Sequence, residues 1–261
     1  MKEKGAQKML KSKLLNNEFT MGSWITIGSP DVAEIMANAN YDWLVVDLEH
    51  SVISIDVAGN LIRVIELSGI APLVRLTSND SNQIKRMMDA GAHGIIVPMV
   101  NSVEDAKHAV AATRYAPKGI RGVGLARAQG YGSKFKEYLD WQATEPVVIV
   151  QIEHIDAINN LEDIINVEGV DGFIIGPYDL SCSMGIPGQF DDKEFISVMN
   201  HILSTGKRLA LPTGIHIVEP DVKLLEKSIM EGYNFIAYSV DIRMLDVSSR
   251  NAFEKVKSIT K

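Results

Sequence analysis

The sequence predicts an α/β protein, a (β/α)8 TIM barrel in which residues 1–261 form a single domain. The first observation is that short apolar runs rich in β-branched residues alternate with helix-like segments eight times. The second is that no linker interrupts this alternation. The third is that the length of 261 residues matches a typical barrel of this class, which has roughly 250. Eight alternations fit a closed barrel better than an open doubly wound sheet.

The predicted elements begin with a short amphipathic helix from Ala6 to Leu15, which we expect to lie across the bottom of the barrel. The eight predicted strands are Gly22–Ile27, Trp43–Asp47, Pro72–Arg75, Gly94–Pro98, Val147–Ile152, Gly172–Ile175, Arg208–Leu211 and Phe235–Tyr238. Residues that favour helix N-caps, such as Ser29, Ser102 and Asp192, begin several of the intervening helices. Short glycine-containing turns precede several strands, as expected between a helix and a strand.

One connection, from about residue 115 to residue 146, is far longer than a loop between a helix and a strand usually is. Its first half is rich in glycine and contains Arg121 and Arg127, and Tyr131 to Ala143 is predicted to be a helix. Long loops of this kind are often lids or contact surfaces. Two interpretations remain open. The connection is either a lid-like segment or subunit contact over the site, or a solvated loop with two exposed arginines.

The composition argues against several classes of protein. The net charge of −7 and the absence of a basic cluster argue against a nucleic-acid partner. No apolar run approaches the roughly 20 residues that span a bilayer, so no membrane partner is expected. The basic N-terminus lacks the apolar segment of a signal peptide, and one cysteine cannot form an intrachain disulfide, so a cytoplasmic location is expected. That cysteine, Cys182, is interpreted as a packed small residue rather than a nucleophile.

Two carboxylates follow neighbouring predicted strands. Glu153 comes directly after residues 147–152, and Asp179 follows residues 172–175, with a helical segment from about residue 156 to residue 165 between the strands. A strand–helix–strand unit places parallel strands side by side, so both carboxylates emerge at the carboxyl edge of the sheet. Two acids placed together are costly unless a cation or a shared proton relieves them. We interpret the pair as a site for Mg²⁺ or Mn²⁺, with Co²⁺ as a further possibility.

Other predicted strands also end in polar residues at this edge, where barrel enzymes carry out their chemistry. These residues are Asp47, Glu49 and His50 after the second strand, Arg75 at the end of the third, Gln151 in the fifth, Tyr178 after the sixth, and Ser239 and Asp241 after the eighth. Any one of them could be an ordinary surface residue. Their joint occurrence at one rim favours a catalytic site.

Each of these residue types has a use in one reaction. A divalent ion held by two carboxylates keeps positions open for a 2-oxo acid, whose keto group it polarises. Arg75 can stabilise the negative charge of an enolate. His50 can move the proton near neutral pH, with Asp47 or a carboxylate from another strand to orient it. Together these roles describe a retro-aldol cleavage that yields pyruvate.

Some absences narrow the chemistry. No lysine stands at the end of a predicted strand, so an aldolase that forms a Schiff base is not expected. The segments PTGIH and SVDIR lack the glycine pair that would bind a phosphate, so the expected substrate is not phosphorylated. The histidines do not have the spacing of a zinc site.

Several motifs resemble the HpcH/HpaI family of metal-dependent class II pyruvate aldolases. They are DLEH, VRL, MDAG, QIE and GPYDLS, in this order, and the similarity runs from about Gly22 to Asp241. The resemblance implies the roles given above for His50, Arg75 and the two carboxylates, and it implies that Gln151 touches the substrate. It also implies that Asp89 of MDAG makes the histidine more basic. Family members are typically hexamers in which neighbouring subunits complete the site, so we expect a homo-oligomer, a hexamer or a trimer.

The leading hypothesis is a class II aldolase that cleaves a 4-hydroxy-2-oxo acid or a 2-keto-3-deoxy sugar acid to pyruvate and an aldehyde. Tyr178 stands where many family members have a small residue, and we expect the choice of aldehyde to depend on Trp24, Tyr178 and Ile215. Two alternatives stay open. One is a citrate lyase-like carbon–carbon lyase that acts on a CoA thioester, although no added basic surface for CoA is evident. The other is a barrel without catalytic activity.

Overall fold

The computed structural model describes residues 5–259. Eight parallel strands form a closed barrel in which each strand pairs with the next and β8 pairs with β1. The strands are β1 (Thr20–Ile25), β2 (Trp43–Asp47), β3 (Ala71–Arg75), β4 (Gly94–Val97), β5 (Val147–Ile152), β6 (Gly172–Ile175), β7 (Thr213–Ile217) and β8 (Phe235–Val240). The predicted closed barrel is confirmed, and seven of the eight strands lie within two residues of their predicted limits.

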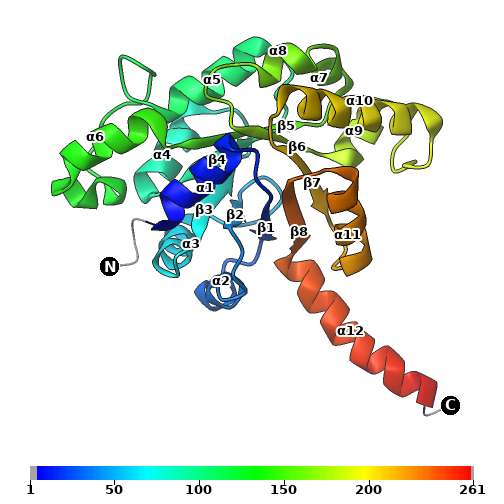
Figure 1. Cartoon of the computed structure of the whole chain (residues 1–261). Helices are drawn as coiled ribbons and strands as arrows, with labels where there is room; N and C mark the ends of the chain where they lie inside the picture. The colour runs from blue at the N-terminus through cyan, green and yellow to red at the C-terminus, as the bar shows by residue number, and fades with distance from the viewer. Residues whose placement is uncertain (1–4, 260–261) are drawn as a thin grey trace.

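Helices surround this barrel (Figure 1). They are α1 (Gly5–Leu15), α2 (Pro30–Ala37), α3 (Ile55–Leu67), α4 (Ser81–Ala90), α5 (Val103–Thr113), η1 (Arg127–Gly132), α6 (Phe135–Thr144), α7 (Ile155–Asn159), α8 (Leu161–Ile165), α9 (Pro177–Ser183), α10 (Lys193–Leu209), α11 (Val222–Glu231) and α12 (Asp241–Ile259). The expected N-caps are present where α5 and α10 begin. The Ser102 side chain accepts from the backbone N–H of Asp105, and that of Asp192 accepts from Glu194 and Phe195.

The prediction of the seventh strand was wrong. Arg208–Leu211 was expected to be a strand, but residues 208 and 209 end α10, and Ala210 terminates the helix with a φ of 52°. The strand itself is Thr213–Ile217, a run that contains a glycine and a histidine and therefore has a weak β signal. Gly214 is needed there, because a Cβ atom would lie 2.8 Å from the ring of Phe235.

The barrel interior is filled by alternate residues of the strands. One buried cluster contains Trp43 and Val45 of β2, Ala71 and Leu73 of β3, Ile149 of β5, Phe235 and Ala237 of β8, and Leu10 and Leu14 of α1. Because side chains alternate between the two faces of a strand, the next inward positions are Asp47, Arg75 and Gln151. We call these three residues the polar layer. It lies at the carboxyl ends of the strands, directly above the apolar interior.

Helix α1 lies at the opposite end of the barrel. The Lys11 ammonium donates to the backbone oxygen of Pro146 at 3.1 Å and forms an ion pair with Asp171 at 2.5 Å. These two partners lie just before β5 and β6 begin, and Leu14 of the same helix reaches the interior cluster. The helix therefore covers the amino-terminal end of the barrel.

The long connection also lies at the amino-terminal end of the barrel. Arg127 donates to the backbone oxygen of Ala90 at 3.1 Å and pairs with Glu66, and both partners lie where α4 and α3 end. Since these helices run antiparallel to the strands, their C-terminal ends are far from the polar layer. The connection therefore does not cover the site of its own chain. The expected helix begins at Phe135 rather than at Tyr131, because Tyr131 has a φ of 55°.

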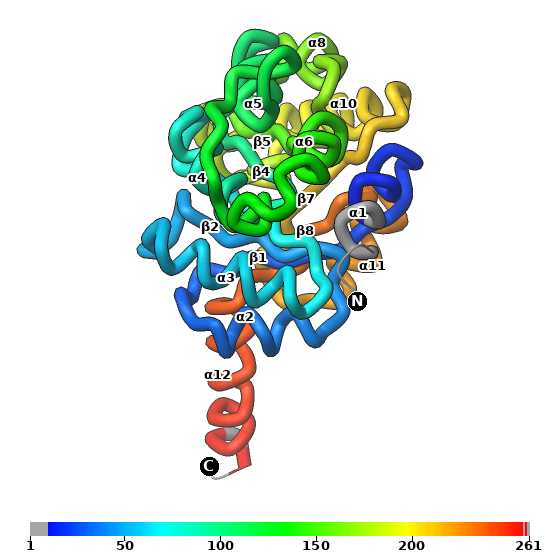
Figure 2. Tube along the Cα trace, turned by 90° about the vertical axis from the view of Figure 1, so that its left-hand side faces the viewer, coloured from blue at the N-terminus to red at the C-terminus, as the bar shows by residue number. Residues whose placement is uncertain are grey.

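Helix α12 extends away from the barrel (Figures 1 and 2). Its first residue, Asp241, is buried and accepts from the backbone N–H groups of Thr26 and Ile27 at 2.9 and 2.7 Å. Farther along, Leu245 and Phe253 are exposed. Among residues 5–259, no helix is long and apolar enough to cross a lipid bilayer.

Candidate active site

Arg75 and Asp47 form the centre of the polar layer. They lie opposite one another in the register of β2 and β3. Nε of Arg75 donates to Oδ1 of Asp47 at 2.8 Å, and Nη2 donates to Oδ2 at 2.6 Å. The guanidinium also lies over the indole of Trp24, 4.3 Å from the ring centroid. The buried Trp24 therefore supports Arg75 from below, and the two-bond contact with Asp47 fixes the plane of the guanidinium.

A second carboxylate, Glu49, also contacts Arg75. Its Oε2 atom lies 3.2 Å from Nη1 of Arg75. Burial raises the pKa of Glu49 to about 7, the charge of Arg75 opposes this rise, and the carboxylates of Glu153, Asp47 and Asp179 add to it. Four acidic side chains are therefore close enough to affect one another.

His50 lies at the exposed edge of this group, with 65% of its side chain accessible. The carboxylate closest to its ring in the same chain is Glu49, whose Oε2 is 3.8 Å from Nε2 of His50. The expectation that Asp47 orients the imidazole is not supported, because Arg75 occupies both oxygens of Asp47. Asp47 contacts His50 through the backbone N–H, at 3.4 Å.

Glu153 is buried and held by two hydrogen bonds. Oε1 accepts from the backbone N–H of Met99 at 2.7 Å, and Oε2 accepts from the side-chain amide of Gln151. Gly176 makes room for this carboxylate, since a Cβ atom there would lie 2.7 Å from Oε2. Burial raises the pKa of Glu153, and the neighbouring Asp179 adds to the rise despite the hydrogen bonds. The hydrogen bonds orient Glu153 but do not neutralise it.

These observations fit a divalent cation. Arg75 contributes one positive charge beside the carboxylates of Asp47, Glu49, Glu153 and Asp179, so the group has an excess of negative charge. Buried Glu153 and exposed Asp179, in the first turn of α9, offer the hard oxygen ligands that Mg²⁺ and Mn²⁺ prefer. Within residues 5–259, no three His, Cys, Asp or Glu side chains are arranged to surround an ion. Water or substrate would therefore complete the coordination.

The family is shown by comparison with known proteins. Residues 20–246 match the family model described as HpcH/HpaI aldolase/citrate lyase. The chain belongs to the HpcH/HpaI family. A hydroxypyruvate/pyruvate aldolase of Sagittula stellata is 38% identical over 236 residues, which are 90% of this chain and 92% of that protein. A 4-hydroxy-2-oxo-heptane-1,7-dioate aldolase of Shigella sonnei is 37% identical over 227 residues, 86% of each chain.

The fold comparison agrees with this assignment. The crystal structure of an HpcH/HpaI aldolase/citrate lyase family protein from Burkholderia cenocepacia has a TM-score of 0.90 and 31% identity, and the match covers 96% of this chain and 99% of that one. The resemblance inferred from the motifs is thereby confirmed. The chain is an enzyme, a carbon–carbon lyase of the aldolase type.

The structure also gives the positions of three other residues that the HpcH/HpaI resemblance or the pocket prediction singled out: Asp89, Tyr178 and Trp24. Asp89 is near the C-terminal end of α4 and pairs with Arg121 at 2.6 Å, so it lies toward the amino-terminal end of the barrel. Arg121 itself is only 4% exposed, which is inconsistent with a solvated arginine. Tyr178 is exposed and packs edge-on against Phe190, and Trp24 supports Arg75.

Two contributors to the HpcH/HpaI site have little or no signal in the sequence. The backbone N–H of Met99 binds Glu153, and no sequence signal indicates this, because Met99 has a φ of 52°, which is uncommon for its type. The other is His216, an inward-facing residue of β7 whose ring lies 5.4 Å from that of Trp24. A correct prediction of this strand would have placed His216 at the same edge as Arg75.

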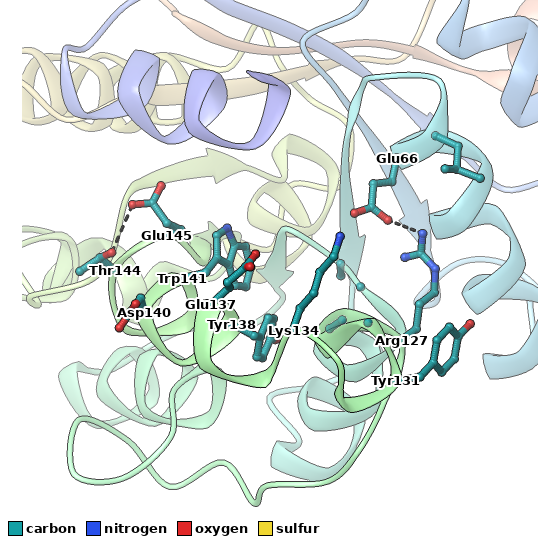
Figure 3. Close-up of a pocket in the computed structure, with 15 residues that line it drawn as sticks. Glu66, Arg127, Tyr131, Lys134, Glu137, Tyr138, Asp140, Trp141, Thr144 and Glu145 are labelled. Atoms are coloured by element: carbon teal, nitrogen blue, oxygen red, sulfur yellow. Dashed lines mark hydrogen bonds and ion pairs between the residues drawn. The ribbon is translucent and has the colours of Figure 1, made fainter. Parts of the chain in front are cut away.

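The cavity in Figure 3 lies at the other end of the HpcH/HpaI barrel. It has a volume of about 820 Å³ and is lined by the long connection, by α6 and by the C-terminal ends of α3 and α4. The Glu66–Arg127 ion pair borders it, and Tyr138 and Trp141 of α6 also line it. None of the carboxylates around Arg75 lines this cavity, so we do not assign it to catalysis.

Proposed function

We propose that this enzyme cleaves a 4-hydroxy-2-oxo acid to pyruvate and an aldehyde, with Mg²⁺ or Mn²⁺ at Glu153 and Asp179. The observation that supports the proposal is the excess of carboxylates beside a fixed arginine at the carboxyl end of the barrel. When bound, the cation supplies Lewis-acid activation of the 2-oxo acid. Two relatives named as aldolases of pyruvate or of a 4-hydroxy-2-oxo acid support the substrate class.

The side chains of the polar layer perform the binding steps. Arg75 uses Nε and Nη2 to hold Asp47. Nη1 lies beside Glu49 and carries two N–H groups, one of which can donate to the keto oxygen on which negative charge develops. Gln151 orients Glu153 through its side-chain amide. A donor fixed before the reaction starts stabilises the enolate without the cost of reorganisation.

His50 is the proposed base. It removes the proton from the C4 hydroxyl group, the C3–C4 bond breaks, and its electron pair forms the enolate of pyruvate while the aldehyde leaves. The same imidazole can then return a proton to C3. The exposed position of His50 supports this role, because the imidazole is accessible to a substrate that approaches from solvent.

We further propose that Asp89 acts on His50 from a neighbouring copy of the chain. Within one chain the two residues lie toward opposite ends of the barrel, so Asp89 cannot perform the role that the resemblance implies. The exposed apolar side chains of Leu245 and Phe253 on α12 support assembly, because such residues are normally covered. A homo-oligomer would satisfy both observations.

The test is pyruvate release from a panel of 4-hydroxy-2-oxo acids, coupled to lactate dehydrogenase, with Mg²⁺ or Mn²⁺ and then with EDTA. We expect release that depends on the metal and that is lost in Glu153→Gln. Release that survives both EDTA and this substitution would overturn the metal assignment. No release from any 2-oxo acid would favour the CoA thioester alternative.

A further inference from the structure

Asp241 is a buried carboxylate at the carboxyl end of the barrel that the proposed reaction does not use. Its Oδ2 atom accepts from the backbone N–H groups of Thr26 and Ile27 at 2.9 and 2.7 Å. Its Oδ1 atom accepts from the hydroxyl of Thr26 at 2.6 Å and from the backbone N–H of Ile242 at 2.8 Å. A carboxylate has about four lone-pair sites. Asp241 therefore uses its acceptor capacity on its own chain and holds backbone rather than a ligand.

The segment that Asp241 holds is the end of β1. This strand ends at Ile25, and its pairing with β2 ends at the same residue, opposite Val46. Thr26 and Ile27 come directly after this last pair, so their N–H groups lie where the strand ladder has stopped. The carboxylate of Asp241 takes the place of a strand partner there.

A bulge in β8 brings Asp241 to this position. Gly22 of β1 pairs with Ala237, whereas Trp24 pairs with Val240, so β8 has one residue more than β1 between the two pairs. Ser239 lies in this bulge and has a φ of 54°, which is uncommon for a residue with a side chain. Bulges of this kind redirect a strand near functional sites. The extra residue directs Asp241 toward the end of β1.

The bulge also fixes the backbone oxygen of Ser239. This oxygen accepts from the hydroxyl of Ser23 in β1 at 3.2 Å, and it lies 3.2 Å from Nε2 of His216. Burial, together with the charge of Arg75, lowers the pKa of His216 to about 4, so the ring is neutral near neutral pH. A carbonyl oxygen can only accept, so Nε2 carries the proton. The bulge thus binds β1 and also a ring that lies 5.4 Å from that of Trp24.

Trp24 links these contacts to Arg75. Its indole lies under the guanidinium, whose central carbon is 4.3 Å from the ring centroid. The indole nitrogen is buried and has no hydrogen-bond partner among residues 5–259. The ring is therefore placed by packing and by its own backbone, which Asp241 fixes two residues farther along, at Thr26.

We propose that Asp241 is a positioning residue, which holds the end of β1 so that Trp24 supports Arg75 in the orientation required at the keto oxygen. This inference rests on the proposed function, which assigns the keto oxygen to Arg75. A donor displaced by about 1 Å stabilises the developing negative charge much less. Loss of the Asp241 contacts should therefore lower kcat and have little effect on the binding of substrate or metal.

The experiment measures kcat and KM for pyruvate release with saturating Mn²⁺. It compares the wild type with Asp241→Asn, in which an amide replaces one accepting oxygen, and with Thr26→Val, which removes only the hydroxyl donor. We expect kcat to fall about tenfold or more in Asp241→Asn and about threefold in Thr26→Val, while KM changes less than about threefold. Asp163→Asn, at an exposed aspartate of α8, is the control and should behave like the wild type.

The same substitutions in a Trp24→Met background show whether Asp241 acts through the indole. Residues that act as a unit have non-additive effects, so Asp241→Asn should lower kcat less than about twofold in this background. An equal loss in both backgrounds would indicate a general structural role and overturn the proposal, as would wild-type kcat in Asp241→Asn. If Asp241→Asn does not fold, Thr26→Val decides by the same comparison.

Failure of the proposed function has a different signature. If the wild type releases pyruvate from no 2-oxo acid, the proposed function is wrong, and tryptophan fluorescence then tests the placement of the indole by Asp241. Asp241→Asn, or Thr26→Val if Asp241→Asn does not fold, should shift the emission maximum of the protein that contains Trp24 and leave that of Trp24→Met unchanged. No shift in the presence of Trp24, or the same shift in both backgrounds, would overturn the role of Asp241.

Discussion

Arg75 binds both carboxylate oxygens of Asp47, through Nε at 2.8 Å and Nη2 at 2.6 Å, while Nη1 stays 3.2 Å from Glu49. The guanidinium therefore has one edge bound to Asp47 and a second edge, at Nη1, beside Glu49. Only a planar group with several N–H donors can present both edges at once. The single ammonium group of a lysine at this position could bind Asp47 or the substrate, but not both.

Arg75→Lys should therefore lower kcat about 100-fold to 1000-fold, the loss that typically follows removal of a donor to a developing oxyanion. The measurement is steady-state pyruvate release with saturating metal. Arg63→Lys, at an exposed arginine of α3, is the matched control and should leave kcat unchanged. A Lys variant with near wild-type kcat would contradict the role assigned to Arg75.

Glu153→Gln should abolish catalysis and yet stabilise the metal-free protein. Burial and Asp179 raise the pKa of Glu153, so a neutral amide of the same shape removes a destabilising charge. We expect Tm without metal to rise by roughly 2–4 °C, the shift that about 1 kcal/mol gives in a chain of this size. Added Mn²⁺ should raise Tm of the wild type but not of the variant.

The control for this measurement is Glu168→Gln, at an exposed glutamate before β6, which should behave like the wild type with and without Mn²⁺. If Mn²⁺ stabilises Glu153→Gln as much as it stabilises the wild type, Glu153 is not a ligand.

His216 should make stability depend on pH. Its pKa is lowered to about 4 in the folded protein, from about 6.5 in an unfolded chain. Between these values the unfolded chain binds a proton that the folded protein does not, so this group destabilises the fold as pH falls through that window. The drop in urea midpoint from about pH 7.5 to about pH 5 should be smaller in His216→Gln than in the wild type. If the urea midpoint falls by the same amount in both proteins, folded His216 binds a proton at pH 5 as readily as the unfolded chain does, which would contradict the prediction.

A variant of Asp89 and a variant of His50 should complement one another when both chains are present in one oligomer. Asp89→Asn and His50→Asn are each expected to have low activity, since each lacks one partner of the dyad. Co-expressed at equal amounts, they should recover up to about a quarter of wild-type activity, because random assembly pairs an intact His50 with a neighbour's intact Asp89 at that frequency. No recovery in mixed assemblies, checked by light scattering, would place both residues in one chain's site or remove Asp89 from catalysis.

Much of the site could be predicted because it stands at strand ends. Strands β2, β3, β5 and β6 consist largely of apolar residues, so the polar residues at or after their ends could be placed at one edge. The run that forms β7, with Gly214 and His216, lacks that signal, so its sequence does not indicate that His216 lies at this edge. Local propensity could not identify the partner of Asp89 either, because Arg121 reaches it from a connection 32 residues away.

The packed interior beneath the polar layer closes the barrel below the proposed active site. Leu10 and Leu14 of α1 close the far end of the barrel, and side chains such as Trp43 and Phe235, stacked 4.3 Å apart, fill its centre. Substrate and products must therefore share one mouth. In the proposed binding mode the 2-oxo acid lies deeper, against Arg75, and the aldehyde lies nearer the exposed His50, so we expect the aldehyde to depart first and pyruvate last. If release has this order, pyruvate should be the product that competes directly with the substrate.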